Sequence, residues 1–93
     1  MSFKTLEINV LGVQQSLFRE NSFGEYWYWH AKGAFGERII RMLSCPRCGN
    51  NMEIRHEETL ADGKLSLSPS VGCSQCRAHF CVVQSQIQVL GDW

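Results

Sequence analysis

The sequence predicts a small all-β domain built from antiparallel hairpins, with little helix. Hydrophobic residues alternate with polar ones over several short segments, which is the period of a half-buried strand. The pair Asp62-Gly63 favours a type I′ hairpin turn. Two Cys-x2-Cys pairs, at 45–48 and 73–76, place thiols on tight turns between strands. At 93 residues, the chain is expected to form one domain over residues 1–93.

The N-terminal part is expected to differ from the rest. Residues 6–10 alternate in polarity and predict a strand that ends near Gly12. Residues 14–24 show no clear periodicity, so we expect a loop there. The domain would then consist of an N-terminal strand and loop extension over 1–25 and a zinc-binding β core over 26–93.

The remaining strands are expected to form hairpins around the cysteine turns. The densest aromatic segment, Tyr26-Trp27-Tyr28-Trp29, has strong β propensity, and Gly33 and Gly36 mark the turn that follows it. The strands expected after residue 24 cover 25–31, 37–44, 52–56, the segment from 65 to the second cysteine pair, 78–83 and 86–90.

The two cysteine pairs predict a structural zinc site in a zinc-ribbon-like domain. Residues 49–72 intervene between the pairs, 24 in all, which is longer than the usual insertion of about 15–20. Four thiolates form the closed tetrahedral shell of structural zinc sites, and the metal adds directly to the folding free energy of a small domain. Buried free thiols or disulfides are the alternative. The expected ligands of Zn²⁺ are Cys45, Cys48, Cys73 and Cys76.

Two other residues lie near this pattern. His79 stands three residues after Cys76, a spacing that also occurs between zinc ligands. We expect His79 either to support the ligands or to substitute for one of them. Cys81 is most simply a buried strand residue, because a free cysteine behaves as a small hydrophobe.

Two groups of residues are candidates for binding a partner. In a strand, the two tryptophans face one side and the two tyrosines the other, so one pair is expected in the core. The other pair is either covered by the N-terminal segment or exposed, where such side chains favour interfaces. The arginines either contact a partner or offset the negative zinc–thiolate cluster. The candidate partner-binding residues are Trp27, Trp29, Arg38, Arg41 and Arg47.

Charge and hydropathy argue against several classes of protein. Nine Lys and Arg balance nine Asp and Glu, and four thiolates with one Zn²⁺ would add about two negative charges. Strong attraction to nucleic-acid phosphates is therefore not favoured. No apolar run approaches the roughly 20 residues that span a bilayer, and residues 1–7 lack the apolar stretch of a secretion signal. We expect no membrane partner and, from the paired cysteines, a reducing cytoplasmic location.

Catalysis is not expected. His56-Glu57-Glu58 followed by Cys73-x2-Cys76 imitates the zinc deaminase signature. However, only 14 residues separate Glu58 from Cys73, no proline precedes Cys73, and no helices are predicted to carry the ligands. A closed four-sulfur site also leaves no open position for water or substrate. We therefore expect neither an enzyme nor a small-molecule substrate.

Three motifs together carry a family resemblance. They are Cys45-Pro46 with Cys48-Gly49, the segment Ser68-Pro69-Ser70-Val71, and Cys76-Arg77-Ala78-His79-Phe80. Residues 26–92 resemble a small domain-of-unknown-function family of bacteria and tailed bacteriophages, some members of which are labelled ammonia monooxygenase. The resemblance implies zinc, a bacterial or phage origin and a role for His79, but no reaction. The additional thiol of Cys73 and the lack of a tryptophan between Leu60 and Ser68 depart from the family pattern.

These observations predict a non-catalytic, structural zinc-binding module that mediates protein–protein interaction or assembly. A phage-encoded virion component or a regulator of a host complex would fit, located in the host cytoplasm or the virion. The alternative is a nucleic-acid-binding zinc ribbon that uses its arginines with exposed aromatic residues. Binding of that kind would weaken steeply with added salt.

Overall fold

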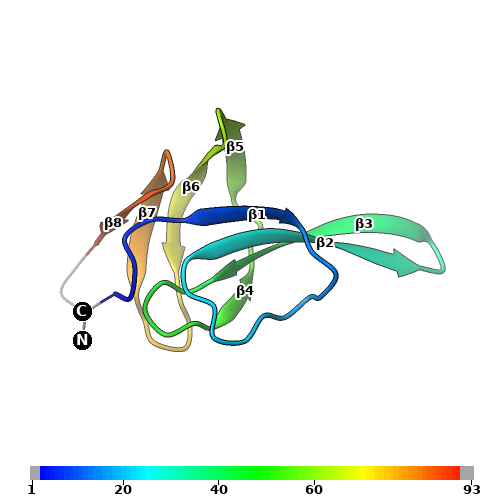
Figure 1. Cartoon of the computed structure of the whole chain (residues 1–93), viewed down its shortest axis with the longest axis horizontal. Helices are drawn as coiled ribbons and strands as arrows, with labels where there is room; N and C mark the ends of the chain where they lie inside the picture. Colours follow the sequence, from blue (N-terminus) through cyan, green and yellow to red (C-terminus); the bar gives the residue numbers. More distant parts are fainter. Residues whose placement is uncertain (1–2, 91–93) are drawn as a thin grey trace.

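The computed structural model describes residues 3–90, which form two four-stranded β-sheets. The sheet orders are β1-β2-β3-β4 and β5-β6-β7-β8, and the strands of the two sheets run across each other (Figure 1). This confirms the predicted all-β fold. Residues 3–90 contain no helix, and so none that could cross a membrane. The strands are β1 Asn9–Val13, β2 Glu25–Gly33, β3 Gly36–Ser44, β4 Asn51–Glu53, β5 Glu57–Ala61, β6 Lys64–Gly72, β7 His79–Val83 and β8 Gln86–Val89.

The start of the chain departs from the predicted strand at 6–10. β1 begins at Asn9 and pairs with β2 in parallel, whereas the other strand pairs are antiparallel. The preceding residues bind the other sheet: the Ile8 N–H donates to the Ser85 C=O, and the Ile87 N–H donates to the Leu6 C=O, at 2.7 and 2.8 Å. The N-terminal segment therefore crosses from one sheet to the other and ties them together.

The predicted strand at 52–56 is shorter than expected, and a separate strand follows it. β4 ends at Glu53 and β5 begins at Glu57, because the chain changes sheets between them. Ile54 is buried and its N–H donates to the Arg41 C=O at 2.8 Å, so the crossing begins only after Ile54. His56 consequently lies in the connection and not in a strand.

The main hydrophobic core lies between the two sheets. Tyr26 and Leu43 from the first sheet meet Leu65, Phe80 and Val82 from the second, all without exposed surface. Burial of each such side chain stabilises the fold by about 1.5–3 kcal/mol. A smaller cluster covers the opposite face of the first sheet and includes Trp27, Ile40 and Met42 under the partly buried Leu11, Leu17 and Trp29. The two tyrosines and the two tryptophans thus face opposite sides of β2, as predicted.

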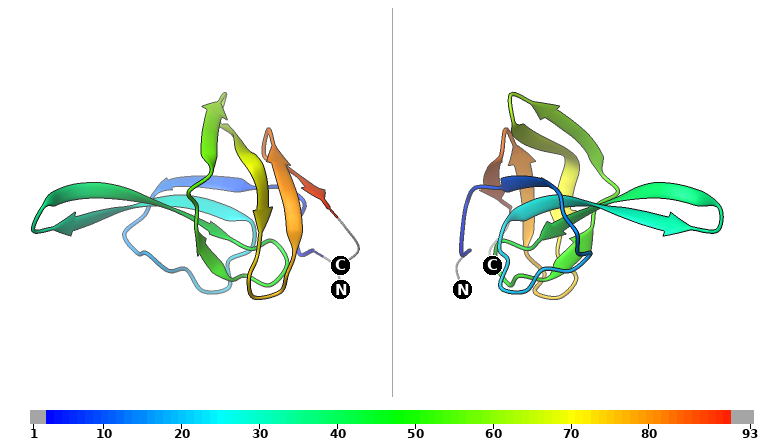
Figure 2. Two further views of the ribbon diagram at one scale, coloured as in Figure 1. Left: turned by 180° about the vertical axis from the view of Figure 1, so that it is seen from behind. Right: turned by 45° about the vertical axis from the view of Figure 1, so that its right-hand side comes forward.

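β2 and β3 continue beyond the body as a two-stranded ribbon, which we call the arm (residues 29–40). Figures 1 and 2 show this ribbon projecting away from both sheets. It is narrow because β1 pairs with β2 only as far as Tyr28, and β4 pairs with β3 only from Met42 onward. The arm contributes to the longest dimension of the molecule, 44 Å against 27 and 19 Å. Phe35 at its tip is fully exposed.

Candidate metal centre

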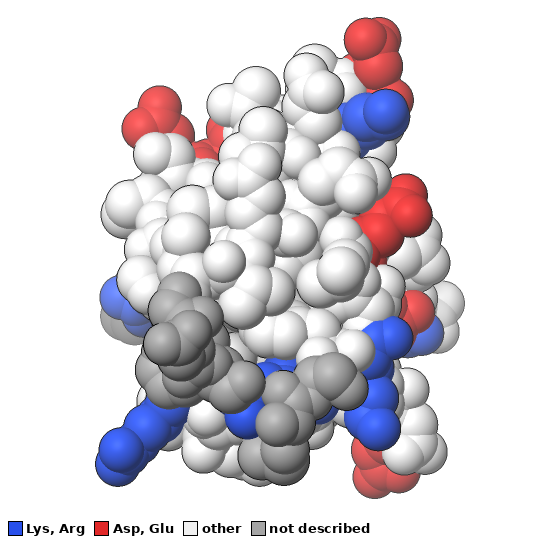
Figure 3. Space-filling view, turned by 90° about the vertical axis from the view of Figure 1, so that its left-hand side faces the viewer, with Lys and Arg blue, Asp and Glu red and all other residues white. Residues whose placement is uncertain are grey.

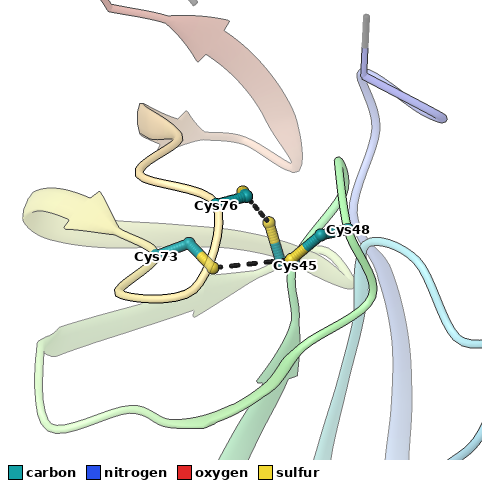
Figure 4. Close-up of side chains that lie close together, drawn as sticks. All are labelled: Cys45, Cys48, Cys73 and Cys76. Atoms are coloured by element: carbon teal, nitrogen blue, oxygen red, sulfur yellow. Dashed lines mark hydrogen bonds between the residues drawn. The ribbon is translucent and has the colours of Figure 1, made fainter. Parts of the chain in front are cut away.

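The two cysteine turns lie side by side, with their sulfur atoms close together (Figure 4). The first turn follows β3 and the second follows β6, so each sheet supplies two thiols. The Sγ atoms of Cys45, Cys48, Cys73 and Cys76 all lie within 4.8 Å of one another. The Sγ–Sγ distance is 3.7 Å between Cys45 and Cys76 and 3.6 Å between Cys48 and Cys73. These two short contacts both join one turn to the other.

The sulfur positions fit one tetrahedral metal ion. Four sulfurs placed about 2.3 Å from a central ion are separated by about 3.8 Å, close to the two short distances. All five cysteines are free thiols, so no disulfide competes for these sulfurs. The four thiols could therefore hold one metal ion, and its donor set would be all sulfur.

The backbones of the two turns are folded alike. In each turn the first cysteine donates its N–H to the C=O of the residue five positions later. The residue four positions later donates its own N–H to the C=O of that cysteine, and all four distances are 2.8–2.9 Å. This donor residue has a left-handed backbone, with φ of 81° at Gly49 and 65° at Arg77. Glycine adopts this conformation without strain, which suits Gly49 to the position after Cys48. Arg77 shows that an exposed side chain is tolerated at the matching position.

Gly49 also lies in a crowded place, which gives a testable prediction. A Cβ at Gly49 would lie 3.1 Å from the Ser22 carbonyl oxygen and 3.2 Å from the Phe23 ring, whereas a Cβ at Gly63 would meet nothing within 4 Å. Both glycines have positive φ, so either alanine variant incurs a backbone cost of about 1–2 kcal/mol. We expect Gly49→Ala to lower the free energy of unfolding by about 2–3 kcal/mol and Gly63→Ala by about 1 kcal/mol in urea titrations. Equal losses would show that the contact with the loop does not matter.

The thiols differ in their electrostatic environment. Burial raises the pKa of the Cys45 thiol and that of the Cys48 thiol above the ordinary value. Burial opposes ionisation of Cys73 as well, but the backbone N–H groups of Cys76 and Gln75 and the neighbouring thiols favour its thiolate and lower its pKa to about 7. Cys73 is therefore the thiol that most readily offers a thiolate to a metal ion, whereas Cys45 and Cys48 would lose their protons to it on binding.

Proton release on metal binding tests these shifts. Because their pKa values are raised, Cys45 and Cys48 are protonated at pH 7, and each must lose a proton when its sulfur binds metal. Cys73, with a pKa of about 7, adds about half a proton. We expect calorimetry with Zn²⁺ in buffers of different ionisation enthalpy to report at least about 2.5 protons released at pH 7, and apparent affinity to rise with pH. Release of fewer than two protons would contradict protonation of Cys45 and Cys48 at pH 7.

His79 does not join the four sulfurs. Its Nε2 lies 2.6 Å from the hydroxyl of Ser70, which stands in β6 shortly before the second cysteine turn. His56 also binds Ser70, with its Nε2 2.9 Å from the Ser70 C=O. The β6–β7 register shifts between Leu67 and Val71, so these two histidines hold the strand where the regular ladder is interrupted. His79 thus supports the approach to Cys73 and is not needed as a ligand.

The candidate partner-binding residues are separated by the structure. Trp27 has no exposed surface, so it is not available to a partner; its ring lies in the smaller cluster with the Arg19 guanidinium carbon 6.0 Å from the ring centroid. Trp29 is half-buried at the base of the arm. Arg38 is exposed on the arm, whereas Arg41 and Arg47 are half-buried. Of the described residues, none accepts a hydrogen bond from the buried Nε and Nη1 of Arg47.

Asn51 is a contributor to the site that the sequence pattern did not identify. Its Oδ1 accepts from the Arg19 N–H at 2.7 Å, and its Nδ2 donates to the C=O groups of Arg19 and Gly49 at 3.1 Å. Asn51 therefore fixes the loop over residues 14–24 to the first cysteine turn. The signal was the pair Asn50-Asn51 directly after the turn glycine, since amide side chains can satisfy backbone groups on both sides.

Comparisons with protein-family models, with curated proteins and with solved structures find no match. The centre is therefore interpreted from its own geometry.

Proposed function

We propose that this protein is a non-catalytic module whose four cysteines hold a structural Zn²⁺ and that mediates protein–protein interaction or assembly. The observation that carries the zinc proposal is the set of four Sγ atoms within 4.8 Å at the junction of the two sheets. Zn²⁺ favours tetrahedral thiolate shells and has no redox chemistry of its own. Its binding would join the sheets and add directly to stability.

A structural metal is supported over a catalytic one by the number of thiols. Catalytic zinc sites keep one position open for water or substrate, and three protein ligands are usual there. Here four thiols surround the position, and Cys45 and Cys73 are buried. The hydrogen-bonded pair of Ser70 and His79 lies outside this set. A closed shell leaves no place for a reacting group at the metal.

The arm supports an interaction role. Phe35 is fully exposed at its tip and Ile39 is 59% exposed on its side. A two-stranded ribbon is marginally stable by itself in water, so a partner that covers it would stabilise it. Exposed aromatic side chains on a projecting element are typical of protein contacts.

Nucleic-acid binding has less support. The chain has zero formal net charge, and a zinc–thiolate centre would make it acidic. On the arm, the Lys32 ammonium lies 3.7 Å from a Glu37 carboxylate oxygen, so one of its few cations is paired. On the face drawn in Figure 3, charges of both signs lie around an uncharged centre. The virion or host-complex setting rests on the family resemblance alone.

Metal content and nucleic-acid binding test the first part of this proposal. We expect elemental analysis of untagged protein to find one zinc per chain, and gel-shift assays with DNA and RNA to find no complex.

A partner contact should map to the arm: a photoreactive phenylalanine analogue at Phe35 should cross-link protein in cells, whereas the same group at the exposed Phe18 should not. Absence of zinc, or salt-sensitive nucleic-acid adducts from position 35, would overturn the proposal.

A further inference from the structure

We propose that the arm binds a second copy of this chain by antiparallel pairing of the two β2 edges about Ala31. This inference rests on the assembly role proposed above and names the partner. Its test measures oligomeric state, which is separate from metal content, so the failure of one can be told from the failure of the other.

The arm has two free edges of equal length. On β2, pairing with β1 ends at Tyr28, which leaves residues 29–33 without a strand partner on the outer side. On β3, pairing with β4 begins at Met42 and Ile54 bonds to Arg41, which leaves residues 36–40 free. Exposed edges of this kind pair readily with another chain unless something prevents it.

The β3 edge is protected against symmetric pairing. A twofold axis that uses all of residues 36–40 passes through their midpoint, Arg38. The Arg41 C=O points to this edge, so the backbone groups of Arg38 point inward and Arg38 would form the closer, non-hydrogen-bonded type of pair. Two arginines would then face each other directly, which is destabilising.

The β2 edge lacks this protection. The midpoint of residues 29–33 is Ala31, so the corresponding twofold places Ala31 against Ala31 in the close pair, where small side chains fit. The Tyr28 C=O accepts from the Gln14 N–H, which shows that the backbone groups of Tyr28 point to the outer side of β2. Since this direction alternates along a strand, the backbone N–H and C=O groups of His30 and Lys32 point outward as well. These two residues would exchange hydrogen bonds with Lys32 and His30 of the second copy. Lys32 already pairs with Glu37, so the ammonium that would face His30 of the second copy is compensated within its own arm.

The same register covers exposed apolar side chains. Trp29 would lie opposite Gly33 of the second copy, so the half-buried indole could spread over a residue without a side chain. The tip of each arm would then lie beside the C-terminal end of β1 of the second copy. The fully exposed Phe35 would approach Val13 of that copy, which is 62% exposed. Both side chains would lose contact with water.

Sedimentation of the zinc-loaded protein tests the proposal. An edge of five residues makes a small interface, so we expect a reversible dimer that appears between about 10 µM and about 1 mM. His30→Pro should abolish it, because it removes an outward N–H without affecting the bonds between β2 and β3. In the dimer, residue 30 of each copy faces Lys32 of the other copy, so one substitution creates two charge pairs. His30→Lys creates two like-charge pairs and should raise the dissociation constant about fivefold, whereas His30→Glu creates two opposite-charge pairs and should lower it.

Thr59→Lys, on an exposed strand of the other sheet, adds the same charge and should leave the dissociation constant unchanged. Zinc content and circular dichroism check that each variant is folded. A protein that stays monomeric over this range overturns the proposal. A dimer that survives His30→Pro, or that responds equally to His30→Lys and His30→Glu, shows that the contact is elsewhere and overturns it as well.

Discussion

Cys45→Ser is expected to leave the protein unfolded at room temperature. Zinc binding contributes about 10–16 kcal/mol of apparent free energy in small thiolate domains, and total stability of a domain is about 5–15 kcal/mol. Cys45 has no exposed surface, and its Sγ lies 3.7 Å from that of Cys76. Serine is a poor zinc ligand and would bury an unpaired hydroxyl in the same place. Circular dichroism melting in the presence of Zn²⁺ should show no cooperative transition.

Cys81→Ser is the matched control, because Cys81 is a free thiol in β7 outside the group of four sulfurs. We expect it to bind one zinc and to melt within a few degrees of the unmodified protein. Removal of zinc by a strong chelator should reproduce the effect of Cys45→Ser, and added Zn²⁺ should reverse it. If Cys45→Ser melts as the unmodified protein does, the metal is not structural.

Trp27→Ala is expected to lower the free energy of unfolding by about 3–5 kcal/mol, through loss of a large buried side chain. Trp27 is fully buried between β2 and the loop that covers its face. Its Nε1 is buried and has no hydrogen-bond partner among residues 3–90. Trp27→Phe removes this unpaired donor together with some volume, so it should cost much less, about 1 kcal/mol. Urea unfolding of zinc-loaded protein gives both values.

Phe35→Ala serves as the control for Trp27→Ala, since Phe35 is an aromatic residue of the same hairpin but fully exposed. Its free energy of unfolding should change by less than about 0.5 kcal/mol. Similar losses in the two alanine variants would contradict the burial of Trp27. The comparison also matters for binding studies, because loss of partner binding in Trp27→Ala would report a damaged fold and not a lost contact.

Local patterns predicted most of the strands after residue 24. The alternation at 37–44, the Asp62-Gly63 turn and the final hairpin each depend on neighbouring residues, and each is present in the structure. The cysteine pairs were also readable, because two ligands from one tight turn are a local feature. That the four thiols meet follows from the metal chemistry of the pattern.

Long-range features could not be predicted in this way. The parallel pairing of β1 with β2 depends on residues 6–8 binding the far sheet, and no local signal marks that contact. Which of the two aromatic pairs is covered also could not be predicted, because the residues that pack over Trp27 include Leu17, from a loop without periodicity. The arm escaped notice for a related reason: its strands have ordinary alternation, and only the lengths of β1 and β4 leave its edges uncovered.

In the proposed dimer, the position of Arg38 on the arm limits how far further copies of this chain can add to this ribbon. A ribbon that accepted strands along both sides could grow into a fibre, because each added copy would offer a fresh template. Because Arg38 opposes pairing of two β3 edges, addition stops once the β2 edge is paired. The cell would then hold a closed pair in place of an open-ended polymer.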